Sequence, residues 1–95
     1  MQNYELTIVL RGNASSTKKK TVTEKVEIII KTLEGKIGKV EEWGKIDLAY
    51  IIKGETSGIF MYFILELDAK GARVLPEKIK MEDDIIRYLF VRAGE

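Results

Sequence analysis

Short polar runs carry the groups in this chain that could perform chemistry. Glu82, Asp83 and Asp84 are consecutive carboxylates, and Mg²⁺ prefers oxygen ligands of this kind. Lys18-Lys19-Lys20 is a run of three cations near the expected start of a helix. The chain has no histidine and no cysteine. Their absence excludes disulfides, thiolate and imidazole metal sites, cysteine nucleophiles and histidine acid–base catalysis.

None of these runs satisfies the geometry of a catalytic or metal site. Consecutive carboxylates in one turn cannot easily all face one ion, so we expect Glu82-Asp83-Asp84 to form a solvated turn. The lysine run opposes the helix dipole and is interpreted as a solvated face. Arg11-Gly12-Asn13 could bind an anion as the first loop of the acylphosphatases does, but it holds a single glycine. We therefore predict no catalytic residue, metal, cofactor or small-molecule substrate.

The charge balance limits the class of partner. The 95 residues include 16 Lys and Arg against 15 Asp and Glu, which gives a net charge of +1. A free-standing nucleic-acid-binding domain is strongly basic, so any contact with nucleic acid must be local or shared with a partner. The sequence has no export signal and no apolar stretch of membrane-spanning length. We expect a cytoplasmic protein that does not contact membranes.

Hydrophobic periodicity predicts six elements in a single domain spanning residues 1–95. Apolar residues alternate with polar ones in the expected strands and recur at helical spacing in two other segments. Gly44 interrupts the second strand and indicates a bulge. The expected elements are a strand at 3–11, a helix capped by Ser15, Ser16 or Thr17 and stopped by Gly35, a strand at 36–53, a hairpin turn at 54–58, a strand at 59–68, a helix at 69–80 and a strand at 85–92.

The order β-α-β-β-α-β predicts the ferredoxin-like plait, an α+β fold. In this split β-α-β arrangement, two helices cover one face of a four-stranded antiparallel sheet and the other face is open. The third strand is apolar on both sides. Either Phe60, Tyr62 and Ile64 or, with the opposite phase, Phe63 and Leu65 lie on the open face. A monomer rarely leaves such an apolar patch without a use.

Two segments resemble a known family. The run from Glu41 to Lys53 contains a glycine, Leu-Ala-Tyr, an aliphatic residue and a lysine, and it is similar to the second strand of the sixth protein (S6) of the bacterial small ribosomal subunit. The run from Met81 to Arg92, with its Ile-Arg-Tyr segment, resembles the family's last helix-to-strand turn and final strand. Tyr4-Glu5, the chain length and the element order also fit. The resemblance covers essentially the whole chain.

The resemblance implies a structural role without catalysis. Members of the family share the plait and bind the central domain of the small-subunit ribosomal RNA. They do so together with a small basic partner, the eighteenth small-subunit ribosomal protein (S18). The resemblance therefore implies both an RNA and a protein partner for this chain, on the ribosome in the cytoplasm.

Four residues are predicted to contact RNA. Lys45 and Lys53 flank the signature strand and Arg87 lies in the final strand, where each could neutralise a phosphate. Tyr50 could stack on a base or hydrogen-bond to a phosphate. The alternatives are ordinary solvated charges for the three cations and a half-buried strand tyrosine for Tyr50.

Phe60 and Tyr62 are predicted to form a patch for the protein partner. Base stacking by these aromatics is the weaker interpretation, since the glycine–aromatic motif of RNA-recognition modules is absent. Simple edge packing is the other alternative. Trp43, before Gly44, is interpreted as a core residue or a cover for the bulge.

The chain departs from the family pattern at several positions. Gln2-Asn3 stands where the family usually has a cation, Ile46-Asp47 where two positions are often basic, and Ile51 where proline is usual. Each lost cation removes a possible phosphate contact. The first helix is also rich in β-branched residues, which lowers its intrinsic propensity. An alternative therefore stays open: an engineered protein on this scaffold that has lost RNA binding, such as a folding or fold-switching model.

Overall fold

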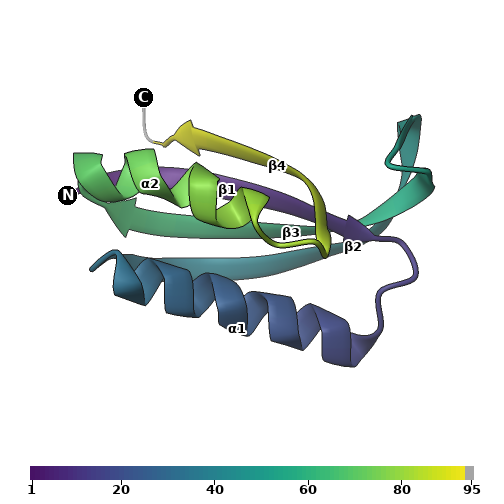
Figure 1. Ribbon diagram of the computed structural model, residues 1–95, viewed down its shortest axis with the longest axis horizontal. Coiled ribbons are helices and arrows are strands. Elements are labelled where there is room, and N and C mark those ends of the chain that lie inside the picture. Colours follow the sequence, from purple (N-terminus) through teal and green to yellow (C-terminus); the bar gives the residue numbers. More distant parts are fainter. Residues whose placement is uncertain (94–95) are drawn as a thin grey trace.

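The computed structural model describes residues 1–93 and has the predicted order of elements. The four strands form one sheet, and the two helices lie against it (Figure 1). The predicted helix and strand positions are confirmed to within a few residues, apart from the hairpin. The elements are β1 (Gln2–Arg11), α1 (Ser16–Thr32), β2 (Lys36–Ile52), β3 (Glu55–Leu67), α2 (Ala69–Lys80) and β4 (Ile85–Arg92).

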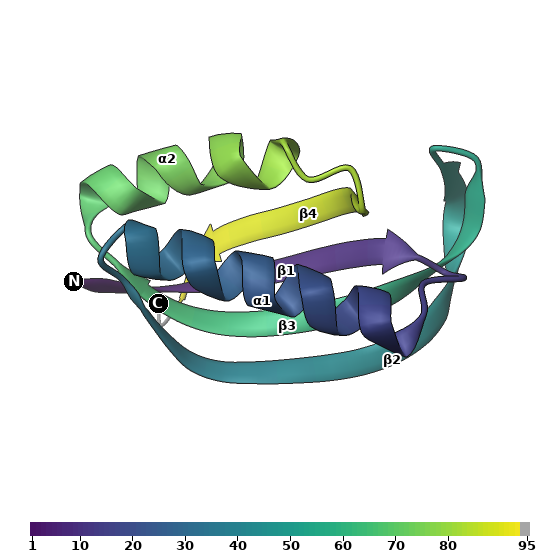
Figure 2. The ribbon, with the colours of Figure 1, turned by 60° about the horizontal axis from the view of Figure 1, so that its bottom comes forward.

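The sheet has the strand order β2-β3-β1-β4, and all neighbouring strands are antiparallel. Both helices cover the same face, as Figure 2 shows with α1 and α2 side by side in front of the strands. This arrangement confirms the ferredoxin-like plait. The strands β2 and β4 are the two edges of the sheet, so a contact between residues of these two strands must reach across its width.

The core lies between the helices and the covered face. The alternating residues Leu6, Ile8 and Leu10 of β1 are fully buried there, and so are Phe63 and Leu65 of β3. This settles the phase of the third strand, because Phe60, Tyr62 and Ile64 must then lie on the opposite, open face. The helices contribute Val22, Val26, Ile30, Leu75 and Ile79, and no polar side chain among the described residues is buried.

Side chains and caps hold α1 in place despite its low propensity. The Ser15 hydroxyl accepts a hydrogen bond from the Lys18 backbone N–H at 3.1 Å, an N-cap contact that supports the helix start. At the other end, Glu34 takes the left-handed conformation with φ of 61°. The predicted stop at Gly35 is therefore off by one residue, since Glu34 makes the turn. Gly35 instead allows the chain to pass close to β3, where a Cβ atom would meet the Glu66 carbonyl.

The predicted hairpin turn at 54–58 is wrong. Lys53 and Gly54 form a two-residue turn with φ of 50° and 80°, and β3 already begins at Glu55. Two consecutive positive φ values give the turn that matches the twist of a hairpin. β1 pairs with β3 only as far as Gly58, so residues 47–57, the hairpin tip, extend beyond the sheet (Figure 1). The predicted bulge at Gly44 is confirmed by a register shift there.

Candidate protein and nucleic-acid interface

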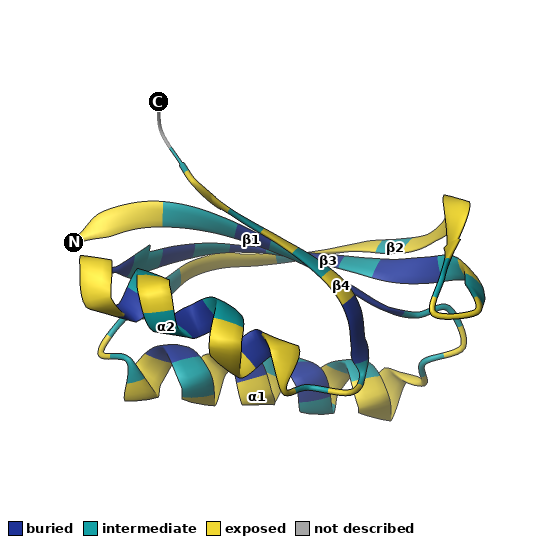
Figure 3. Ribbon diagram, turned by 45° about the horizontal axis from the view of Figure 1, so that its top comes forward, coloured by how far each residue is buried: buried dark blue, intermediate teal, exposed yellow. Residues whose placement is uncertain are grey.

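Neither helix covers the second face of the sheet, the open face (Figure 3), and the strand register places aromatic and aliphatic side chains there. Cross-strand partners share a face, and the register places Thr7 of β1 opposite Tyr62 of β3 and Leu89 of β4. Leu89 is 61% exposed. The central strands therefore present a mixed surface in which apolar groups are reachable from solvent. Its members on β1, β3 and β4 include Glu5, Thr7, Val9, Phe60, Tyr62, Ile64, Arg87, Leu89 and Val91.

The hairpin tip closes one end of this face into a groove. Leu48 and Ile52 come from the tip, yet they line the same hollow as Leu89 of the opposite edge strand. The tip must therefore curl across the open face. The hollow has a volume of about 290 Å³ and is lined by Thr7, Val9, Leu48, Ile52, Phe60, Arg87, Tyr88 and Leu89. We call it the apolar groove.

The two predicted partner residues differ in their surroundings. Phe60 lines the apolar groove, whereas Tyr62 stacks on Trp43 with ring centroids 5.0 Å apart and an interplanar angle of 18°. Trp43 is 50% exposed, so the core interpretation is wrong and it covers the open face beside the bulge. One ring face of Tyr62 is thus occupied within the chain. Phe60 is the member of the pair that stands at a hollow.

A small charge network fixes this aromatic stack. The Trp43 indole N–H donates to the Glu41 carboxylate at 3.0 Å, and the Lys39 ammonium lies 2.8 Å from the same carboxylate. The hydrogen bond from Lys39 lowers the pKa of Glu41 and that from Trp43 lowers it further, while Glu41 raises the pKa of Lys39. Partial burial, followed by a hydrogen bond with Glu5, raises the pKa of the Tyr62 phenol. The phenol therefore stays neutral at ordinary pH.

The predicted RNA-contacting residues are only partly brought together. Lys53 and Arg87 line one hollow of about 210 Å³ at the start of β4, where the hairpin tip meets the end of α2. Lys45 is paired with Ile59 on the helix-covered side of the sheet, so it points away from Arg87. Tyr50 is 80% exposed on the hairpin tip. The predicted half-buried alternative for Tyr50 is therefore wrong.

Sequence reasoning missed Lys80, which lines the same hollow as Lys53 and Arg87. We call the hollow formed around these three residues the cationic hollow. In the sequence, Lys80 looks like Lys78, since both lie in the last turn of α2 where cations complement the helix dipole. Lys80 differs from Lys78 only because the hairpin tip folds back over the sheet and brings Lys53 to the hollow that Lys80 lines. The periodicity of the sequence does not predict this folding back.

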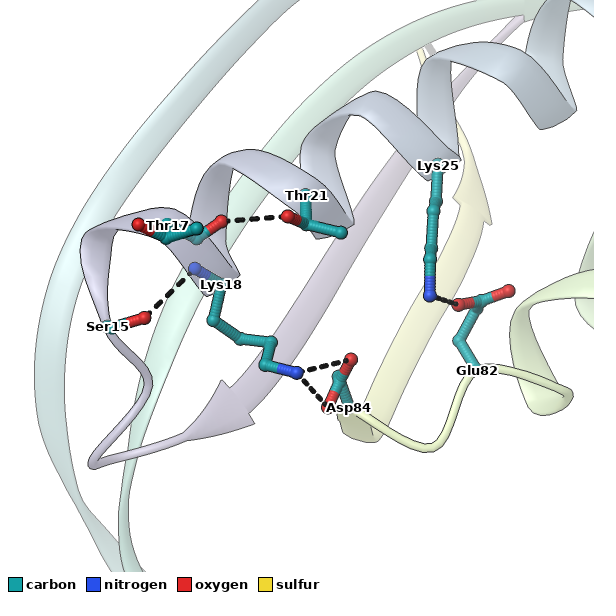
Figure 4. A network of polar contacts seen from close by, with 7 residues as sticks. All are labelled: Ser15, Thr17, Lys18, Thr21, Lys25, Glu82 and Asp84. Atoms are coloured by element: carbon teal, nitrogen blue, oxygen red, sulfur yellow. Dashed lines mark hydrogen bonds and ion pairs between the residues drawn. The ribbon is translucent and has the colours of Figure 1, made fainter.

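Two lysines of α1 form ion pairs with the carboxylate run before β4. Lys18 lies 3.4 Å from Asp84 and Lys25 lies 3.2 Å from Glu82, as Figure 4 shows. Lys19 pairs with Glu42 of β2 at 2.9 Å. The two acidic residues thus tie the turn before β4 to α1. Within residues 1–93, no group of three acidic side chains is arranged to hold a metal ion.

The hairpin is also tied down by charge. Arg11 at the end of β1 lies 3.2 Å from Glu55 at the start of β3, so the arginine of the Arg11-Gly12-Asn13 loop already has a carboxylate partner. This pairing argues against an anion site on that loop. Neither helix of the described chain is long and apolar enough to cross a bilayer.

Comparisons with known proteins agree on one family. A family model described as Ribosomal protein S6 matches residues 3–92. The chain is 37% identical over 93 residues to small ribosomal subunit protein bS6 of Pelagibacter ubique strain HTCC1062, covering 98% of this chain and 77% of that protein. It is 30% identical to bS6 of Thermoanaerobacter pseudethanolicus, across the full length of both. The crystal structure of 30S ribosomal protein S6 from Thermotoga maritima superposes with a TM-score of 0.89 at 27% identity, covering 97% and 87% of the two chains.

Proposed function

This chain belongs to the ribosomal protein S6 family of the small subunit, and we propose that it binds central-domain ribosomal RNA together with the small basic protein S18. Its relatives are structural ribosomal proteins and not enzymes. The alternative of a redesigned scaffold is not favoured, because ribosomal proteins match nearly the whole chain. As a ribosomal component, the protein would act in the cytoplasm.

The observation that carries the proposal is the apolar groove on the open face. Phe60, Leu48 and Leu89 line it together, and an exposed apolar surface of this kind is typical of a protein-binding site. Aromatic side chains at the centre of a desolvated pocket carry much of the binding energy of an interface. We assign the groove to the protein partner, with Phe60 as the main anchor and Tyr62 beside it.

The charge balance supports a shared RNA interface. With a net charge of +1, the chain has little long-range attraction for RNA, and a basic partner would supply most of it. Lys45, Lys53 and Arg87 would contribute local phosphate contacts, and the exposed Tyr50 ring would stack on a base. Arg87 lines both the apolar groove and the cationic hollow, so RNA and partner would meet beside it.

Gel-shift binding to a central-domain ribosomal RNA fragment tests the proposal, with and without S18 and at two salt concentrations. We expect binding that depends on the partner and weakens as salt increases. Lys45→Ala and Lys53→Ala should each flatten the salt dependence by up to about one unit of log–log slope. Lys70→Ala, at the start of α2, is a control of equal charge change. A cooperatively folded protein that fails to bind with its partner present would contradict the proposal.

A further inference from the structure

We infer that Lys53, Lys80 and Arg87 together bind a single phosphate group of the RNA backbone in the cationic hollow. This inference rests on the proposed function and adds to it a defined site with three ligating residues. The residues come from three elements, namely the hairpin turn, the last turn of α2 and the start of β4. They are distant in sequence, and only the curl of the hairpin tip unites them.

The charges around the hollow are unbalanced. Five of the 16 basic residues have a carboxylate within 4 Å among the described residues, and the other eleven have none. Lys53, Lys80 and Arg87 are the members of those eleven that line this one hollow. The remaining lining residues are apolar or neutral: Ile79, Ile85, Ile86 and Tyr88. Three like charges around one hollow repel each other. A bound anion would convert that repulsion into attraction.

The size and chemistry of the hollow favour a single phosphate. Its volume of about 210 Å³ is below the range of roughly 300–1,000 Å³ typical of sites for whole small molecules. An arginine can hold two phosphate oxygens with its planar fork, while lysines act as flexible point charges. One arginine and two lysines therefore provide a mixed cradle for one phosphodiester. The neighbouring backbone of an RNA strand would continue along the open surface outside.

The residue type at Lys53 is a second observation, because the hairpin turn sets the positive φ but does not call for a lysine. Its φ of 50° lies in the left-handed region, which asparagine and glycine adopt more readily than lysine. No ion pair of the Lys53 side chain within residues 1–93 offsets this cost. Unfavourable backbone conformations tend to occur at functional sites. A cation held in this conformation at the rim of a positively charged hollow is consistent with anion binding.

A salt titration distinguishes one shared phosphate from three separate ones. The slope of log affinity against log salt counts the phosphates that are neutralised. We compare wild type with the triple variant Lys53→Asn/Lys80→Ala/Arg87→Ala, using the central-domain RNA fragment with S18. The control is Lys31→Ala/Lys70→Ala/Lys78→Ala, which makes the same charge change at exposed positions that do not line this hollow. Thermal unfolding of each variant verifies that it is folded.

We expect the triple variant to lose about one unit of slope and on the order of tenfold in affinity at 0.1 M salt, with the control near wild type. A loss of about three units would mean three separate phosphates and would overturn the shared site. Equal behaviour of the variant and the control would overturn it as well, while leaving the proposed function intact. A wild-type protein that fails to bind RNA would overturn both.

A second arm separates the RNA backbone from free phosphate. Amide chemical shifts around Lys53, Lys80 and Arg87 are followed during titration of the wild-type protein with inorganic phosphate alone. We expect weak shifts that do not saturate in the millimolar range, because one phosphate without the rest of the strand lacks the other contacts. Saturation at micromolar phosphate would assign the hollow to a free anion and overturn its assignment to RNA.

Discussion

Helix α1 and the cationic hollow are both basic, but three lysines of α1 have carboxylate partners and the three cations of the hollow have none among the described residues. Lys18, Lys19 and Lys25 each have a carboxylate within 3.4 Å. In the cationic hollow, no carboxylate lies among the described lining residues. In the conspicuous Lys18-Lys19-Lys20 run, Lys18 and Lys19 are therefore neutralised, and only Lys20 has no carboxylate within 4 Å among the described residues. The less conspicuous set, scattered over three elements, keeps its positive field.

Under the proposed function, pairing, and not the density of cations, would decide where this nearly neutral protein attracts RNA. Surface ion pairs contribute only about 0–1 kcal/mol to stability. They still matter for binding, because a lysine that is already next to a carboxylate gains less from a phosphate. Under the proposed function, Glu82 and Asp84 would compete with RNA phosphates for Lys25 and Lys18, whereas no carboxylate lines the hollow within residues 1–93.

Removing the carboxylates of Glu82 and Asp84 should abolish the difference between the paired lysines of α1 and the unpaired cations of the hollow. In Glu82→Gln/Asp84→Asn, Lys18 and Lys25 lose their partners. We expect binding to an unrelated RNA to tighten by up to about 100-fold at 0.1 M salt, roughly tenfold for each freed cation that reaches a phosphate. Gel-shift assays at several salt concentrations measure this. Asp83→Asn is the control, because Asp83 lies between the two paired carboxylates but forms no ion pair itself among the described residues. Unchanged non-specific binding in the double variant would show that the ion pairs do not restrain Lys18 and Lys25.

Truncating Phe60 should weaken binding of the protein partner at the apolar groove without removing a charge from the neighbouring cationic hollow. Phe60→Ala removes the aromatic floor of the groove, and a central aromatic anchor is typically worth about 2 kcal/mol or more. We expect the affinity for S18 alone to fall on the order of 30-fold in calorimetry. Ile28→Ala, an exposed apolar residue on α1, should leave that affinity unchanged. Equal effects of the two substitutions would remove Phe60 from the protein interface.

Breaking one ion pair should change stability only slightly. A double-mutant cycle of Lys25→Ala and Glu82→Ala isolates the interaction seen at 3.2 Å. We expect a coupling of about 0.2–1 kcal/mol in the free energy of unfolding, measured in urea, and a smaller value at high salt. A coupling above 2 kcal/mol would mean that the pair has a structural role beyond that of an ordinary surface contact.

The ion pair between Lys39 and Glu41 on the open face should produce the smallest of these effects, a shift in the pH at which Glu41 is protonated. The hydrogen bond from Lys39, with that from Trp43, lowers the pKa of Glu41 below its ordinary value of 4.5. A lowered folded-state pKa means that the stabilisation is present above pH 4.5 and is lost as pH falls through the folded value. Since Trp43 is the single tryptophan, its fluorescence should report a midpoint below 4.5. The transition should be absent in Glu41→Gln; a midpoint at or above 4.5 would contradict the pairing.

The elements could be predicted from sequence because their signals are local. Alternation in residues 3–11, the helical stripe of Val22, Val26 and Ile30, and the cap at Ser15 each depend on neighbouring residues alone. The hairpin turn was misplaced because Gly54 to Gly58 has a glycine at each end and a polar middle, which is typical of a loop. Lysine at the first turn position gave no signal, since asparagine is the residue expected there.

The site was harder to predict because its members meet only through tertiary structure. Phe60 and Arg87 were predicted as partner and RNA contacts from strand alternation and from the family resemblance, and these roles stay predictions. Lys53 and Lys80 line the same hollow only because the hairpin tip curls over the sheet, and the periodicity of the sequence does not predict that curl. The pairing of Glu82 with Lys25 likewise required the packing of α1 against the turn before β4. Sequence patterns located the charged residues, and the fold determined which of them remain unpaired.

The most direct test of the account compares two triple variants in one RNA titration across salt concentrations. One variant removes the unpaired cations Lys53, Lys80 and Arg87; the other, Lys18→Ala/Lys19→Ala/Lys25→Ala, removes the same charge from paired positions. We expect the first variant to lose about one unit of salt slope and about tenfold in affinity, and the second to stay within about twofold of wild type. A larger loss in the second variant would contradict the account.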